Sequence, residues 1–156
     1  MIGTETTIGR CTMISTKGRY ALRVLVDIER QGDRTPVPLR DVARRQGISE
    51  KYLQHVVKLL VTKGLLVGTS GKGGGYRLCK PASSITALEA LEAAEGTLAP
   101  VACLAPEAAP CERATTCATL PLWRKYDAMM KELFGNVTIA DLDAGTIDDA
   151  HTGTPS

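Results

Sequence analysis

Residues 47–64 have the sequence GISEKYLQHVVKLLVTKG, and this stretch decides the fold. Its apolar side chains recur at the three- and four-residue spacing of one helical face, which predicts a helix over residues 50–63. Ser49 suits the N-cap because its hydroxyl can accept a hydrogen bond from a free amide of the first turn, and Gly64 is expected to end the helix. The side chains expected to face inward are those of Leu53, Val56, Val57 and Leu60.

Two more amphipathic segments precede this helix and predict helices over residues 17–31 and 39–46. Gly32 can end the first of them in a left-handed cap. The second is separated from the helix at 50–63 by the glycine-containing turn at 47–49. Two helices joined by a short turn of this kind are typical of a helix-turn-helix, the motif that places its second helix in the major groove of DNA.

A short β-hairpin is predicted directly after these helices. Strands over residues 65–67 and 76–78 flank a glycine-rich tip, GKGGG, at residues 71–75. A nucleotide-binding loop is the competing interpretation of this tip, but the spacing is not that of a P-loop, and a strand follows where a P-loop has a helix. The sequence therefore predicts a mainly α fold with a small β-hairpin wing, a winged helix-turn-helix.

The second half of the chain has a different character. Residues 85–95 predict an amphipathic helix, and residues 120–134 predict another with apolar side chains available for burial. Between them, residues 96–119 are rich in Ala, Pro and Cys and show no period, which indicates a functional or disordered loop. Residues 137–142 predict one or two further helical turns.

The near-neutral net charge of +2 hides two oppositely charged halves. Residues 13–81 hold 14 Lys and Arg against 5 Asp and Glu, a net charge of +9, whereas residues 82–156 hold 4 against 11, a net charge of −7. Unless it is chance clustering, the basic half indicates a polyanionic partner. No apolar run approaches the roughly 20 residues that span a bilayer, and the first residues do not resemble a secretory signal. We therefore expect a cytoplasmic protein with no membrane partner.

Four polar side chains are expected on the outer face of the helix at residues 50–63. They recur at i, i+3, i+4 and i+7 and so form one stripe, which consists of Lys51, Gln54, His55 and Lys58. Two amines, an amide and an imidazole can contact phosphates and base edges in a major groove. Any surface helix carries polar residues opposite its buried face, but the preceding helix, the turn and the basic excess favour DNA.

Four further residues complete the predicted DNA-binding set. Ser49 and the first-turn amides can meet a phosphate, because a helix N-terminus favours anions. Tyr52 either adds a hydroxyl contact or packs. At the wing tip, Lys72 places a cation suited to a phosphate or to the minor groove, and Arg77 can support it from the strand. The expected partner is double-stranded DNA.

Three of the five cysteines gather in the loop at residues 96–119. Cys103, Cys111 and Cys117 have the spacing C-x7-C-x5-C, whereas Cys11 and Cys79 stand alone. Thiolates select soft metals, and three of them in one short stretch can converge on one metal centre. The spacing differs from the C-x2-C pairs of structural zinc sites, so an iron–sulfur cluster is preferred. Zinc and a metal-free thiol switch remain as alternatives.

Several motifs in the same order resemble those of the Rrf-type winged-helix transcription regulators. The resemblance covers about residues 13–143 and rests on MISTKGRYALR at 13–23, ISEKYL at 48–53, GKGGGYRL at 71–78, LW at 122–123 and VTIADL at 137–142. It implies a homodimeric regulator, most simply a repressor, whose long C-terminal helices pair across a two-fold axis so that two winged helices bind a palindromic operator. It also implies that Cys103, Cys111 and Cys117 hold a [2Fe-2S] or [4Fe-4S] cluster whose state reports iron, oxygen or nitric oxide.

The composition and the predicted elements along the chain also indicate a domain order. We expect a disordered extension at 1–12, a winged-helix DNA-binding domain at 13–81, a cysteine loop with dimerisation helices at 82–142, and a flexible tail at 143–156.

One ligand position departs from the family's pattern. In some family members the fourth ligand is a histidine three residues after the last cysteine, and this chain has Leu120 at that position. In other members it is an N-terminal aspartate, and this chain has Arg19 at that position. The fourth ligand is therefore left open among Glu107, Glu112, a residue of the other subunit and a small thiol.

Some family members work without a cluster, so the resemblance also allows a cluster-free regulator that uses its cysteines as thiol redox sensors or binds a partner enzyme. A third hypothesis, a small redox enzyme or electron carrier, has no substrate pocket, cofactor fingerprint or catalytic pair in the sequence to support it.

Overall fold

The computed structural model describes residues 14–32 and 35–147 of the chain. The elements follow one another as α1 (Thr16–Gln31), α2 (Leu39–Gln46), α3 (Glu50–Thr62), β1 (Leu66–Thr69), β2 (Gly75–Leu78), the 3-10 helix η1 (Ala82–Ser84), α4 (Ala87–Glu95), the 3-10 helix η2 (Ala102–Leu104), α5 (Leu120–Gly135) and α6 (Ile139–Ala144). These mainly helical elements with an antiparallel hairpin confirm the predicted fold class. The extension expected at residues 1–12 and the tail from residue 148 lie outside the described residues.

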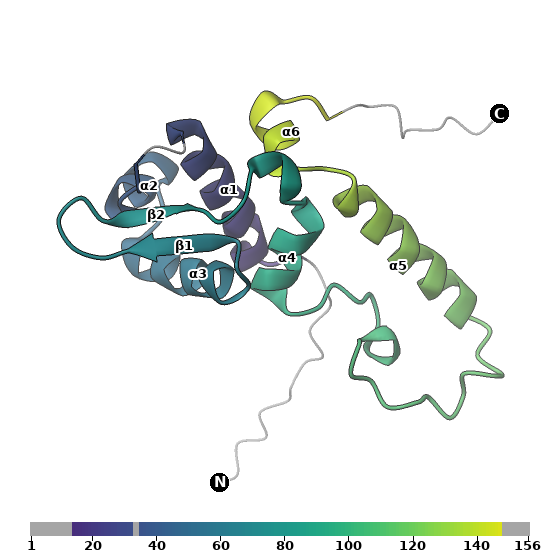
Figure 1. Ribbon diagram of the computed structural model, residues 1–156. Coiled ribbons are helices and arrows are strands. Elements are labelled where there is room, and N and C mark those ends of the chain that lie inside the picture. The colour runs from purple at the N-terminus through teal and green to yellow at the C-terminus, as the bar shows by residue number, and fades with distance from the viewer. Residues whose placement is uncertain (1–13, 33–34, 148–156) are drawn as a thin grey trace, which may run out of the picture.

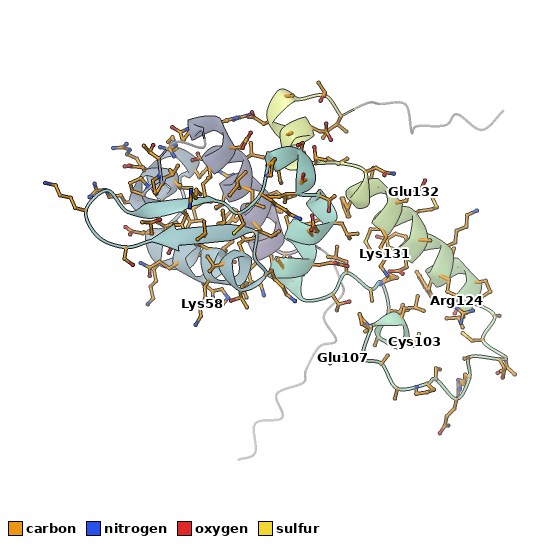
Figure 2. The ribbon with its side chains drawn as sticks, in the orientation of Figure 1. Lys58, Cys103, Glu107, Arg124, Lys131 and Glu132 are labelled. Atoms are coloured by element: carbon orange, nitrogen blue, oxygen red, sulfur yellow. The ribbon has the colours of Figure 1, made fainter. Side chains whose placement is uncertain are left out.

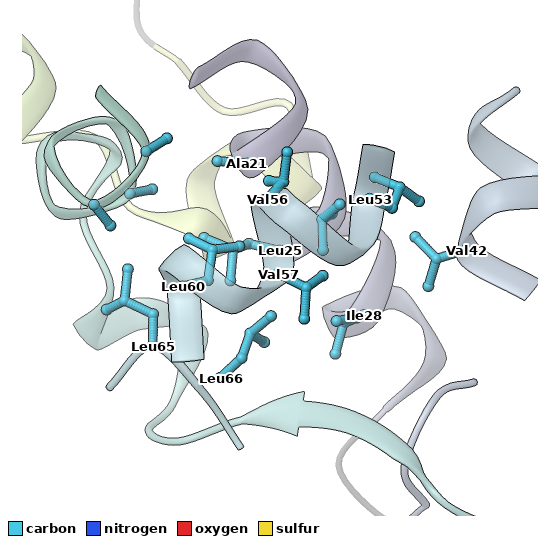
Figure 3. Packing of buried hydrophobic residues seen from close by; sticks show 14 of the residues in the cluster. Ala21, Leu25, Ile28, Val42, Leu53, Val56, Val57, Leu60, Leu65 and Leu66 are labelled. Carbon is cyan, nitrogen blue, oxygen red and sulfur yellow. The ribbon is translucent and has the colours of Figure 1, made fainter. Parts of the chain in front are cut away.

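The core lies where α1, α2, α3 and the hairpin meet, and it continues into α4 and the start of α6 (Figure 3). Leu25 of α1 and Val42 of α2 are completely buried. The four inward side chains predicted on α3 expose at most 1% of their surface, which confirms that stripe; they are Leu53, Val56, Val57 and Leu60. Burial of each such side chain stabilises the fold by about 1.5–3 kcal/mol. The core therefore determines which face of α3 points outward.

The turn between α2 and α3 has the predicted geometry. Gly47 follows α2 in the left-handed conformation (φ 64°, ψ 34°), which a residue with a Cβ adopts only at a cost. The Ser49 hydroxyl accepts a hydrogen bond of 3.2 Å from the amide of Tyr52, so the predicted N-cap is confirmed. Helix α3 then ends at Thr62.

The wing is anchored to the link between α1 and α2. The strands pair from Leu66–Leu78 to Thr69–Gly75, and Tyr76 exchanges backbone hydrogen bonds of 2.8 and 2.9 Å with Val37. Strand β1 begins one residue later than predicted, because the amide of Leu65 donates to the carbonyl of Leu60 at the end of α3. The predicted strand at 65–67 is corrected accordingly to Leu66–Thr69.

Two wing glycines are required by close backbone contacts, one within the hairpin and one between the hairpin and Val37. A Cβ atom on Gly74 would lie 2.3 Å from the carbonyl oxygen of Thr69, and one on Gly75 would lie 2.4 Å from that of Val37. Side chains at these positions would therefore collide with backbone before any ligand approached.

The helix predicted at residues 85–95 begins later than expected. Thr86 is the N-cap of α4 and forms a capping box with Glu89, which favours a helix start at Ala87. Ile85 is extended, and its carbonyl accepts a hydrogen bond of 2.9 Å from the amide of Ile139. This backbone pairing joins the start of α4 to the start of α6.

Helix α5 projects from the rest of the protein, at the end of the long loop that follows α4 (Figure 1). Its main contacts are with α4, and Leu120 at its start is its buried residue. Helix α6 returns to pack against α1. It ends at Ala144, two residues after the predicted end.

Candidate nucleic-acid interface and cysteine loop

The outer face of α3 is polar and exposed. Its four predicted DNA-binding side chains are all exposed and lie on the face opposite the core; they are Lys51, Gln54, His55 and Lys58. In Figure 2, Lys58 points away from the body of the protein. The fold therefore brings these four side chains together on one surface.

Within the part of the chain that the structure describes, the cations of this surface are not paired with carboxylates. Across residues 14–32 and 35–147, the ion pairs found involve Arg30, Arg44, Arg45, Lys80 and Lys131. Lys51 and Lys58 on α3 take part in none of them, and neither do Lys72 and Arg77 on the wing, both of which are exposed. Their charges are thus available to a polyanion.

A groove of about 580 Å³ runs between α3 and the wing. Its lining residues are Gln54, Lys58, Val61, Thr62, Gly68, Thr69, Ser70, Gly75 and Tyr76. The sequence pattern predicted Gln54 and Lys58 at this surface but not the hydroxyl groups of Thr62, Thr69 and Ser70. Thr62 lies on α3 four residues after Lys58, so helical spacing could have found it, and its hydroxyl donates a hydrogen bond of 2.8 Å to the Lys58 carbonyl. Thr69 and Ser70 are brought there by the hairpin's packing against α3, which no local sequence signal marks.

Tyr52 packs against α1. Its ring meets that of Tyr20 edge to face, with the centroids 5.6 Å apart, and the guanidinium carbon of Arg23 lies 5.3 Å from the centroid of Tyr20. Of the two roles that the sequence allowed for Tyr52, this contact favours packing. The Ser49 hydroxyl is likewise engaged, as the N-cap of α3.

A buried carboxylate joins α1 to α2. Asp27 is only 4% exposed and accepts hydrogen bonds from Arg45 Nε at 3.1 Å and from Gln46 Nε2 at 2.7 Å. Arg23 in turn donates to the side chain and the backbone carbonyl of Gln46, at 2.9 and 2.6 Å. The hydrogen bond to Asp27 raises the pKa of Arg45. This network links α1 to α2.

The three loop cysteines do not form a ligand cluster in one copy of the chain. Cys103 in η2 and Cys111 in the loop are exposed, and Cys117 is half-exposed just before α5. Among the described residues, no three His, Cys, Asp or Glu side chains lie close enough to hold a metal ion. Figure 2 places Cys103 and Glu107 in the same short segment of the loop.

Cys117 has the surroundings of a reactive thiol. Its Sγ lies 3.5 Å from the Thr119 hydroxyl. Hydrogen bonds from the side chain and backbone of Thr119 and the backbone of Leu120, with the charge of Arg113, lower the pKa of Cys117 below its ordinary value. The thiolate is both the metal ligand and the nucleophile. The donor chemistry of the loop therefore fits an iron–sulfur cluster and thiol redox chemistry equally.

Comparison with known proteins decides the family. The Rrf2 family, described as iron-dependent transcriptional regulators, matches residues 14–144. The chain belongs to the Rrf2 family. The resemblance seen in the sequence motifs is thereby confirmed.

Two relatives of this Rrf2-family chain cover most of its length. Protein rrf2 of Nitratidesulfovibrio vulgaris is 37% identical over 130 residues, which make up 83% of this chain and 85% of that protein. The HTH-type transcriptional regulator IscR of Yersinia pseudotuberculosis is 34% identical over 129 residues, 83% of this chain and 77% of IscR.

Solved structures agree with the family assignment. CymR, the global cysteine regulator of B. subtilis, has a TM-score of 0.69 at 31% identity and covers 85% of this chain and 97% of its own. T. potens IscR has a TM-score of 0.69 at 25% identity and covers 92% of this chain and 93% of its own.

These relatives are regulators, not enzymes, and they identify this chain as a transcriptional regulator, a role that implies DNA as its ligand. Within residues 14–32 and 35–147, no helix has the length and hydrophobicity to cross a membrane. The cytoplasmic location stays a prediction.

Proposed function

We propose that this Rrf2-family regulator is a homodimeric repressor that binds a palindromic operator in double-stranded DNA through α3 and the wing. The observation that carries the proposal is the exposed polar stripe on α3, opposite the core and outside the ion pairs. Lys51 and Lys58 supply amines for phosphates, and Gln54 supplies an amide that can pair with the edge of adenine. His55 adds a further donor or acceptor.

Other contacts extend this surface. Lys72 and Arg77 bring cations from the wing. The N-terminus of α3 at Ser49 offers backbone amides to a phosphate, with Tyr52 beside it. Together these groups suit contacts with a DNA phosphate backbone that passes from α3 to the wing.

The homodimer is supported by α5. Four large apolar side chains on this helix are 49–60% exposed; they are Leu122, Tyr126, Met129 and Leu133. Their spacing of three and four residues places them on one face. A second copy of α5 is the proposed cover, because the two-fold axis of such a pair would match a palindromic operator.

The DNA proposal is tested by titrating a labelled duplex, selected from random sequences by the wild-type protein. Lys58→Ala is expected to weaken binding to all sequences alike, whereas Gln54→Ala is expected to relax the preference at one base position by about 1–3 kcal/mol. Lys131→Ala is the control, because Lys131 lies on α5, apart from the stripe (Figure 2). Unchanged affinity of Lys58→Ala at low ionic strength would contradict the proposal.

The same proposal assigns Cys103, Cys111 and Cys117 to a [2Fe-2S] or [4Fe-4S] cluster. The three thiols and the description of the family as iron-dependent support this assignment. Glu107, Glu112, a residue of the other subunit or a small thiol completes the ligand set. Oxidation or loss of a bound cluster would release thiolates and reorder the loop, so the regulator would report iron, redox or nitric oxide status.

Anaerobic reconstitution with iron and sulfide tests the cluster. The wild-type protein is expected to turn brown and absorb visible light, and Cys111→Ala is expected to lose this chromophore. Cys79→Ala is the matched control, since Cys79 is exposed but lies outside the loop. A colourless wild-type protein after reconstitution would reject the cluster.

The second candidate is a cluster-free Rrf2 regulator whose cysteines act as thiol redox sensors. One observation supports it: the pKa of Cys117 is lowered, and the thiolate is the form that reacts with oxidants. Mass spectrometry after mild peroxide treatment tests it, because this candidate predicts disulfides among Cys103, Cys111 and Cys117. A variant of this candidate uses the C-terminal half to bind a partner enzyme.

A further inference from the structure

The C-terminal end of α4 is fastened to the N-terminal end of α1 by one carboxylate oxygen. Glu95 Oε1 accepts hydrogen bonds from the backbone amide and the hydroxyl of Ser15, both at 2.7 Å, and from the amide of Gly18 at 3.1 Å. Ser15 is the N-cap of α1, and its hydroxyl also accepts from the amide of Lys17. A negative charge here stabilises the free amides and the dipole of α1.

Gly18 allows the carboxylate to come this close. A Cβ atom at residue 18 would lie 2.6 Å from Glu95 Oε1, 3.0 Å from a methyl group of Ile14 and 3.1 Å from one of Leu91. Gly18 is nonetheless buried in an ordinary helical turn. The absence of a side chain at this position thus serves the contact between α1 and α4.

Glu95 stands at the junction between the cysteine loop and the DNA-binding domain. It is the last residue of α4, and the loop begins at Gly96. On the other side of the contact, the first turns of α1 lead to Tyr20, whose ring contacts Tyr52 at the start of α3. These contacts, together with the course of α1, form a path from the loop to the DNA-binding helix.

A second carboxylate fastens the other end of α4 to the wing. Glu89 Oε1 accepts a hydrogen bond of 2.8 Å from Lys80 Nζ, and Lys80 follows β2 closely. A displacement of α4 would therefore act on α1 and on the base of the wing together. Packed elements held by discrete contacts can pass such a displacement from one site to another.

We propose that Glu95 is a positioning residue that transmits the state of the cysteine loop to α3, by holding or releasing the first turn of α1. This inference rests on the proposed function, since it requires a loop that senses and a helix that binds DNA. It adds the connection between them.

The test compares the wild type with three variants. Each protein is measured after anaerobic reconstitution with iron and sulfide, and again after a chelator has removed the metal. Glu95→Ala removes the acceptor from α4. Gly18→Ala displaces it from the α1 side, because the end of a flexible side chain yields most easily to the new Cβ. Glu92→Gln is the matched control: Glu92 is also on α4, but its side chain makes no hydrogen bond or ion pair within the described ranges.

Two quantities are measured: the Kd for the selected duplex, and amide hydrogen exchange in α1 and α3. In the wild type and Glu92→Gln, the two loop states are expected to differ at least about fivefold in Kd. In Glu95→Ala and Gly18→Ala, that ratio is expected to fall to within about twofold of one. Exchange at the first turn of α1 is expected to speed up in both, and exchange in α3 is expected no longer to respond to the loop state.

The outcomes separate the two claims. If the wild-type Kd is the same in both loop states, the sensing function is overturned, and this inference is overturned with it. If the Kd of the wild type changes with the loop state and the Kd of Glu95→Ala changes by the same factor, only this inference is overturned. If Glu95→Ala does not fold, Gly18→Ala decides between the same outcomes, because its α4 is unchanged.

Discussion

Asp27 links α1 to α2 through a buried carboxylate. It is buried and serves as the common acceptor for Arg45 and Gln46. Asp27→Ala would leave a guanidinium and an amide without their partner, so we expect the free energy of unfolding to fall by about 2–3 kcal/mol. Urea denaturation followed by circular dichroism measures this change. Asp41→Ala is the control, because Asp41 pairs with the exposed Arg44 at 3.4 Å and should cost no more than about 1 kcal/mol.

At the residue scale, what could be predicted was local. The buried stripe of α3 and the cap at Ser49 follow from spacing within one helix, and both are confirmed. The partners of Asp27 lie 18 and 19 positions away, and Ser15 lies 80 positions from Glu95. Such contacts depend on how whole helices pack, and no periodicity of the sequence reveals them.

At the element scale, α5 is a helix with little of its surface buried. Met129→Glu would place a charge in the exposed apolar stripe, so we expect it to convert the proposed dimer into a monomer. Analytical ultracentrifugation measures the change. Ala128→Glu introduces the same side chain at the neighbouring exposed position, on a different face of the helix, and is expected to remain dimeric. A dimeric Met129→Glu variant would show that another surface pairs.

Glu89, in the first turn of α4, makes the stability of the fold depend on pH. Burial tends to raise the pKa of Glu89, but hydrogen bonds from Lys80 and Thr86 outweigh it, and the net pKa lies below the ordinary value of 4.5. A depressed carboxyl pKa stabilises the fold above pH 4.5, and this contribution is lost as the pH falls through the folded-state value. Thermal unfolding at a series of pH values should therefore show a shallower acid limb for Glu89→Gln than for the wild type. Glu92→Gln should keep the wild-type limb.

The same region shows where prediction of the elements failed. Ile85 is apolar and correctly spaced for the helix that follows, so the pattern included it. Its backbone instead pairs with Ile139, and the capping box of Thr86 and Glu89 starts the helix at Ala87. Ile85 would be buried whether it began the helix or preceded it as extended backbone, so periodicity alone does not distinguish these two arrangements.

At the scale of the whole molecule, the sequence placed the three thiols in one loop but did not determine whether they meet. The path of residues 96–119 decides that, and this segment has no hydrophobic period from which a path can be inferred. The division of charge was more informative, because it marked the N-terminal half, which carries the exposed stripe of α3 and the wing.

The proposed two-fold symmetry makes a quantitative prediction about salt. Each phosphate contact contributes about 0.9 to the slope of log Kd against log salt concentration. Lys72 is exposed on the wing, and a dimer on a palindrome brings two copies of it to the DNA. Lys72→Ala should therefore lower the slope by about two, whereas a protein bound through one wing would lose about one. Lys131→Ala should leave the slope unchanged, because its amine is paired with Asp127 on α5. An unchanged slope for Lys72→Ala would exclude the wing from the interface, while a loss of about one would exclude symmetric binding by two wings.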